Sequence, residues 1–216
     1  MRLIIILITL NFLYANDFAR LNSSPTIQML QNQKNAKPCS NPAKAKENFD
    51  SDFRYGCFCG KKYPNIVSDN NESYQTLGRV QRDKLIEKYY KIKPYDDIDA
   101  LCMQHDICYI YEGREDQLCN DAMYSSLREL SDKFYEQARG EDSDSKAMRC
   151  ERLASDIGAI FKTIFGAGDN LSMMRFGMFM MINTPMTMVS KGIQKASHGM
   201  NDSPLYPLEG ERCEVE

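Results

Sequence analysis

The chain has 216 residues, enough for one domain with a sizeable core or for a small domain with long extensions. Its 12 glycines and 8 prolines are too few for a fibrous or low-complexity protein. The formal net charge is −3 and no run of basic residues occurs, which argues against nucleic acid as a partner and against binding driven mainly by anionic lipid headgroups.

Residues 1–15 have the form of a signal peptide. Basic Arg2 precedes an apolar run from Leu3 to Leu13, and small Ala15 comes just before polar Asn16. The run is too short to span a bilayer, which takes about twenty apolar residues. We therefore predict a secreted protein, extracellular or periplasmic, without a transmembrane anchor. The alternative is a retained N-terminal anchor, because Leu13 is large for its place near the proposed cut.

All eight cysteines follow that cut, and an even number in a secreted chain predicts four disulfides. Residues 16–50 are polar and predict an extended N-terminal arm that Cys39 could pin. Residues 53–62 interleave glycine and cysteine with aromatic residues, which indicates a tight loop held by disulfides. Residues 63–95 begin as a polar loop and continue as an amphipathic helix, whose expected apolar side holds Val80, Leu85, Ile86 and Tyr89.

The stretch Asp96–Tyr109 is the densest cluster of reactive side chains and predicts a helix. Pro94 precedes it, and aspartates suit its N-cap and first turn. Helical spacing places one buried stripe of reactive side chains on it, namely Cys102, His105, Cys108 and Tyr109. Asp106 stands one step round from this stripe.

A second long helix is predicted from about Gln117 to Ala138. One face holds its apolar residues and Asn120, namely Cys119, Asn120, Met123, Tyr124, Leu127 and Leu130, and the opposite polar face holds Asp121, Ser125, Arg128 and Asp132. We assign residues 51–150 to a core and residues 151–216 to a helical, methionine-rich extension. Its stretch Leu171–Ser190 contains Pro185 and is a poor membrane span, so we interpret it as a buried or interfacial helix; methionines also suit a surface that meets lipid or a partner.

The histidine of the central helix could be a metal ligand, a general base or a buried core residue. Zinc could draw on Cys57, Cys59, Cys102, His105 and Cys108, although disulfides compete for these thiols. Calcium suits the residues better, because the glycine-rich loop can turn backbone carbonyls inward and Asp106 adds a carboxylate. His198 lies in the polar tail, so His105 is the predicted general base.

Together, the loop Tyr55–Gly60 and the helix Asp96–Tyr109 resemble the calcium loop and active-site helix of the secreted phospholipase A2 family. The resemblance covers roughly residues 53–130. It implies a mainly α, disulfide-linked fold with two long antiparallel helices and a calcium-binding loop. It also implies Ca²⁺-dependent hydrolysis of the sn-2 ester of phospholipids.

The resemblance also implies roles for single residues. His105 matches the catalytic base and Tyr109 a supporting tyrosine. Calcium would be held by the Asp106 carboxylate and by backbone carbonyls of the loop, those of Phe58, Gly60 and Lys62, while the Gly60 amide would help hold the oxyanion. The implied disulfides are Cys59 to Cys102 and Cys108 to Cys119; the other four cysteines, Cys39, Cys57, Cys150 and Cys213, allow three pairings.

The chain departs from the family pattern in four places. A cysteine is missing where Leu101 stands and at its partner position, Ser126 or Leu127. Lys62 replaces a common loop glycine, and the connection between loop and helix is longer than usual. The family has an aspartate that orients the histidine, whereas here Asn120 precedes Asp121; helical phase favours Asn120, and a one-residue shift would restore Asp121.

These residues predict a secreted, calcium-dependent phospholipase A2-type hydrolase whose substrate is a phospholipid at a membrane or micelle interface. His105 would activate water, and calcium would stabilise the oxyanion. The alternative is a catalytically weak or inactive phospholipase-like protein that binds or perturbs membranes, which Asn120 and Lys62 favour.

Overall fold

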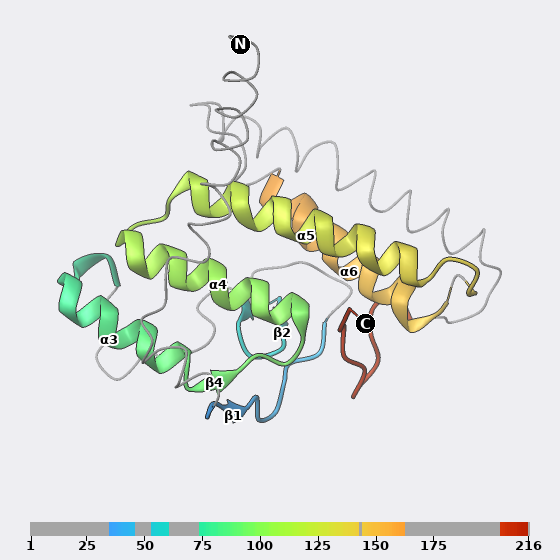
Figure 1. Cartoon of the computed structure of the whole chain (residues 1–216), viewed down its shortest axis with the longest axis horizontal. Helices are drawn as coiled ribbons and strands as arrows, with labels where there is room; N and C mark the ends of the chain where they lie inside the picture. The colour runs from blue at the N-terminus through green and yellow to red at the C-terminus, as the bar shows by residue number, and fades with distance from the viewer. Residues whose placement is uncertain (1–34, 46–52, 61–73, 143, 163–203, 216) are drawn as a thin grey trace, which may run out of the picture.

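The structure of the protein is a computed structural model, and it describes residues 35–45, 53–60, 74–142, 144–162 and 204–215 (Figure 1). The predicted signal peptide at 1–15, Lys62 and the methionine-rich stretch Leu171–Ser190 lie outside the described residues.

Within the described residues the fold is mainly helical, as predicted. Its α-helices are α3 (Arg79–Tyr89), α4 (Asp97–Glu112), α5 (Gln117–Gln137) and α6 (Lys146–Ile160), with a short 3-10 helix η1 at Tyr74–Thr76. Four two-residue strands form two small sheets, in which β1 (Lys37–Pro38) pairs in parallel with β4 (Ile92–Lys93), and β2 (Arg54–Tyr55) pairs antiparallel with β3 (Cys59–Gly60).

The helices pack in chain order, α3 on α4, α4 on α5 and α5 on α6. Among the described helices the two longest are α4 and α5, which run in opposite directions across the turn after Gly113 (Figure 1). Gly113 ends α4 in the left-handed conformation, with φ of 72°, and its N–H donates to the Tyr109 carbonyl. No helix in the described ranges is long and apolar enough to cross a membrane.

The predicted faces of α5 are confirmed, because Met123 and Leu127 are fully buried while Asp121 and Arg128 are exposed. For α3 the prediction is right for Leu85, Ile86 and Tyr89, which are buried, and wrong for Val80, whose side chain is 68% exposed. Val80 lies in the first turn of α3, beyond the stretch that packs on the core.

All eight cysteines form disulfides. The two pairs that the resemblance implies, Cys59–Cys102 and Cys108–Cys119, are both present, and the other four cysteines pair as Cys39–Cys57 and Cys150–Cys213. The first of these two bonds pins the N-terminal arm to the loop 53–60. The second ties α6 to the C-terminal tail, and the core boundary drawn at residue 150 falls within α6.

The loop 53–60 is seated on the start of α4 by one side chain. The Asp99 carboxylate is fully buried and accepts backbone N–H groups from Cys57 at 3.0 Å, Phe58 at 2.7 Å and Tyr95 at 2.8 Å. Gly56, next to these donors, has φ of 59°, and a Cβ atom there would lie 2.3 Å from the Asp99 Cγ. Glycine is therefore required at position 56 by conformation and by space.

We predict that Gly56→Ala lowers the free energy of unfolding by about 1–3 kcal/mol more than Gly140→Ala does. Gly140 also has a positive φ, 91°, but a Cβ there would meet nothing within 4 Å, so its substitution isolates the conformational cost. Urea unfolding of both variants with disulfides intact measures the difference. Equal destabilisation would show that the loop is not seated against Asp99.

Candidate functional site

His105 lies on the inward face of α4 and its side chain is almost fully buried. Its Nε2 atom lies 2.9 Å from Oδ1 of Asn120, which projects from the first turn of α5. The Tyr109 hydroxyl donates a hydrogen bond to the same Asn120 oxygen. The disulfide Cys108–Cys119 joins the two helices at this level, so covalent and polar contacts fix His105 and Asn120 together.

This geometry sets the tautomer of the imidazole. With the amide oxygen of Asn120 facing the ring, Nε2 carries the proton and donates it, which leaves Nδ1 as an acceptor. Burial lowers the pKa of His105 to about 4, and the hydrogen bond to Asn120 only partly opposes that shift. At neutral pH His105 is therefore uncharged and able to accept a proton at Nδ1.

Two aromatic rings enclose His105. The ring of Tyr109 lies 4.2 Å away between centroids, and the ring of Phe161 meets the imidazole edge-on at 4.8 Å. Phe161 follows the end of α6, more than fifty residues along the chain from His105. The two rings and the buried setting exclude water from most of the imidazole.

Asp106, the next residue of α4, has its carboxylate close to the His105 ring. Its Oδ1 lies 3.9 Å from Nδ1 of His105, and its Oδ2 is buried without a hydrogen-bond partner in the part of the chain that the structure describes. About a quarter of the side chain is accessible, so the group faces both solvent and interior. Burial, with a smaller effect from the Asp99 charge, raises the pKa of Asp106 well above its usual value. A hard cation would satisfy the unpaired oxygen and reverse that shift.

Two of the three loop residues proposed as calcium ligands are described. Phe58 is buried and stacks on Tyr89 with ring centroids 5.6 Å apart, and Gly60 has φ of 135°, where a Cβ would lie 2.4 Å from the Phe53 carbonyl oxygen. The disulfide Cys59–Cys102 fastens this loop one helical turn before Asp106. The unpartnered oxygen of Asp106 and a loop fastened to the same helix are compatible with a calcium ion, and Lys62 lies outside the described residues.

The zinc alternative is wrong. Each of Cys57, Cys59, Cys102 and Cys108 is in a disulfide, so no thiolate remains beside His105. Among the described residues no group of three or more His, Cys, Asp or Glu side chains is arranged to hold a metal ion. A site at Asp106 would instead depend on backbone oxygens.

Of the two alternatives for orienting the histidine, the structure brings Asn120 to His105. Asp121 points to solvent on the opposite side of α5 and accepts a hydrogen bond from the Gln117 side chain at 2.8 Å. The helix begins after Asp116, whose side chain caps it through the Leu118 N–H, and this start sets the phase that turns Asn120 inward.

Sequence reasoning missed two supporting carboxylates. Asp96 and Asp99 were expected to cap α4 and face its dipole, and Asp96 does cap the helix by accepting the Asp99 N–H. Both are also buried, and Asp99 holds the loop while Asp96 accepts the Tyr55 hydroxyl. The spacing of Asp99, two helical turns before Asp106 on the same side of α4, is the signal that could have indicated this role.

Comparison with known proteins adds no assignment: no protein-family model, no curated protein and no solved structure matches the chain.

We predict that Asn120→Asp raises the pKa of His105 by roughly 1–3 pH units, because a carboxylate at Nε2 stabilises the imidazolium. Asp121→Asn, which removes an exposed carboxylate on the opposite face, leaves that pKa unchanged. Titration by NMR in the presence of a chelator separates the two cases, since the chain has only His105 and His198. If the pKa of His105 rises in neither variant, or rises equally in both, the assignment of Asn120 as its partner is contradicted.

Proposed function

We propose that this protein is a secreted, calcium-dependent hydrolase of the phospholipase A2 type, which cleaves the sn-2 ester of phospholipids. One observation carries the proposal: a buried histidine, oriented through Nε2, lies beside a carboxylate whose buried Oδ2 has no partner among the described residues. The two disulfides that the resemblance implies support it further, because they join the loop to α4 and α4 to α5.

In the proposed reaction His105 is the general base. Its Nδ1 takes a proton from a water molecule, whose oxygen attacks the carbonyl carbon of the ester. The imidazolium then returns this proton to the oxygen of the leaving glycerol. Asn120 keeps the ring in place through both steps by accepting a hydrogen bond from Nε2–H, and the Tyr109 hydroxyl donates to the same Asn120 oxygen.

The ion would be held by Asp106 and by the carbonyl groups of Phe58, Gly60 and Lys62. When bound, calcium supplies a positive charge that polarises the ester carbonyl and binds the lipid phosphate. The Gly60 amide would donate to the developing oxyanion. Phe58 and Gly60 have little freedom to move, because the loop is pinned by Asp99 on one side and by a disulfide on the other.

The proposed substrate is a phospholipid presented at a membrane or micelle surface. Four disulfides are typical of proteins from an oxidising compartment, and with the signal-peptide-like residues 1–15 they support secretion.

Asn120 favours a second candidate function, a phospholipase-like protein that binds or perturbs membranes and hydrolyses slowly or not at all. A neutral amide orients the imidazole but does not stabilise its positive charge as a carboxylate does. The low pKa of His105, about 4, also makes it a weaker base than an unburied histidine. Activity measurements decide between this candidate and the enzyme.

We predict that calcium raises the melting temperature of the protein by several degrees and that Asp106→Asn abolishes the rise. At a calcium concentration 100-fold above its dissociation constant, binding adds about 2.7 kcal/mol to the stability of the folded state. Asp121→Asn is the matched control and should retain the full shift, because that carboxylate faces solvent on α5. An equal shift in both variants would place calcium elsewhere.

We predict that the disulfide-intact mature protein releases fatty acid from mixed phospholipid micelles only with calcium present. His105→Gln should lower the rate by about 10²–10⁴-fold, because it removes the proton acceptor. The measurement is titration of the fatty acid released by the unaltered protein in calcium, by the same protein in chelator, and by His105→Gln in calcium. If folded protein shows no release above the variant's background, the enzyme proposal fails and the binding candidate stands.

A further inference from the structure

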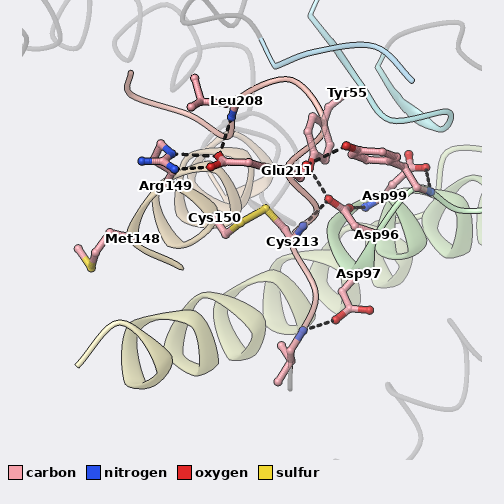
Figure 2. The surroundings of a disulfide bond; sticks show 12 residues. Tyr55, Asp96, Asp97, Asp99, Met148, Arg149, Cys150, Leu208, Glu211 and Cys213 are labelled. Carbon is pink, nitrogen blue, oxygen red and sulfur yellow. Dashed lines mark hydrogen bonds and ion pairs between the residues drawn. A yellow bond between two sulfur atoms is a disulfide. The ribbon is translucent and has the colours of Figure 1, made fainter. Parts of the chain in front are cut away.

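The C-terminal segment 204–215 lies against two helices that are distant in the sequence. At its beginning the Tyr206 hydroxyl donates to Asp156 of α6 at 2.7 Å. Farther on, the segment reaches the start of α4, next to the loop 53–60 (Figure 2). It therefore connects α6 to the part of the molecule that carries the proposed calcium loop.

Two strong links fix the segment to α6. One link is the disulfide Cys150–Cys213, in which both cysteine side chains are fully buried. The other is the ion pair between Arg149 and Glu211, with Nε to Oε2 at 3.1 Å and Nη2 to Oε1 at 2.5 Å (Figure 2). Both side chains are mostly buried, so this two-bond pairing holds the segment more firmly than an exposed ion pair would.

From these anchors the segment contacts the first residues of α4 through its backbone. The Cys213 N–H donates to Oδ2 of Asp96 at 2.9 Å, and the Cys213 carbonyl accepts the Asp97 N–H at 3.1 Å. The Val215 N–H donates to the Asp97 carboxylate at 2.8 Å. The Tyr95 hydroxyl also donates to the Glu211 carbonyl at 2.8 Å. The segment thus helps to cap α4.

One oxygen atom joins the segment to the loop. Oδ2 of Asp96 accepts both the Cys213 N–H and the Tyr55 hydroxyl, and Tyr55 lies in β2 opposite Cys59 of β3. The rings of Tyr55 and Tyr95 also meet edge-on at 6.1 Å. Displacing the segment would remove a donor from buried Asp96 and loosen both supports of Tyr55.

We propose that the C-terminal segment is a positioning element for the loop 53–60, acting through Asp96, and that it tightens binding of calcium by that loop. The statement about calcium rests on the proposed function; the statement about the loop does not. Ordering the loop before the ion arrives reduces the entropy lost on binding.

Hydrogen exchange at the Cys57 and Phe58 amides, measured by NMR in chelator, tests the loop directly because both groups donate to Asp99. Replacing both Cys150 and Cys213 by Ala should accelerate their exchange about tenfold or more, while the Leu127 amide in the core of α5 changes far less. Equal acceleration at all three amides, or none at the loop, overturns the proposal.

A milder pair of variants keeps the test decisive if the double variant does not fold. Tyr95→Phe removes the hydroxyl that binds the segment beside α4, and Tyr206→Phe removes the hydroxyl that binds it to α6. Each loses a hydrogen bond from a tyrosine hydroxyl, to the Glu211 carbonyl in the first variant and to the Asp156 carboxylate in the second. We expect several-fold faster loop exchange in the first variant than in the second, and equal rates in the two overturn the proposal.

Tyr55→Phe tests whether the effect passes through Asp96. In that background the hydrogen bond that joins Asp96 directly to the loop is absent, so adding Tyr95→Phe should produce little further acceleration. Full additivity of the two substitutions overturns this route.

Calcium titration by calorimetry gives a separate readout. Tyr95→Phe should weaken binding about three- to tenfold relative to Tyr206→Phe, the range that corresponds to one net hydrogen bond. If the unaltered protein binds no calcium, the proposed function fails while the exchange results still decide the role of the segment. If calcium binds equally in both variants, the statement about affinity is overturned.

Discussion

The buried carboxylate of Asp99 is the constraint on which the arrangement of the site depends. A charge in the interior is tolerated only where several donors surround it, and here backbone N–H groups of Cys57, Phe58 and Tyr95 supply them. Burial raises the pKa of Asp99, and these hydrogen bonds act against that rise. The loop and the start of α4 cannot separate without removing the Cys57 and Phe58 donors from this buried carboxylate. The helix that carries His105 therefore also fixes the backbone proposed to face the ion.

The packing of α6 on α5 is a second constraint. The phospholipase A2 resemblance implies a disulfide between α4 and α5 that this chain lacks, since Leu101 and Ser126 or Leu127 stand at those places. Fully buried Leu127 packs beside Gly158 of α6, where a Cβ atom would lie 3.6 Å from the Leu127 Cβ. Burying one such leucine contributes about 1.5–3 kcal/mol, similar to a typical disulfide. Apolar packing by α6 can thus offset the missing covalent link.

The parts of the site that local periodicity controls were predictable from the sequence. Helical phase placed Asn120 inward and Asp121 outward on α5, and the stripe on α4 placed His105 between two disulfide cysteines. The role of Phe161 was not predictable, because it depends on how α6 folds back across the site. The same holds for Asp96 and Cys213, whose contact spans more than one hundred residues. Position in a pattern indicates which face a residue occupies, but not which distant segment covers that face.

The neutral side chain at position 120 adds no second buried carboxylate beside His105 and Asp106. Burial raises the pKa of Asp106 well above its usual value, so this part of the interior accepts a negative charge only at considerable cost. A carboxylate at position 120 would be almost fully buried as well, with the Tyr109 hydroxyl and His105 as its donors. Asn120 makes the same two hydrogen bonds without adding charge. Asparagine at position 120 therefore favours stability of the ion-free protein over stabilisation of the imidazolium. Bound calcium would reduce the repulsion that a carboxylate at this position would meet.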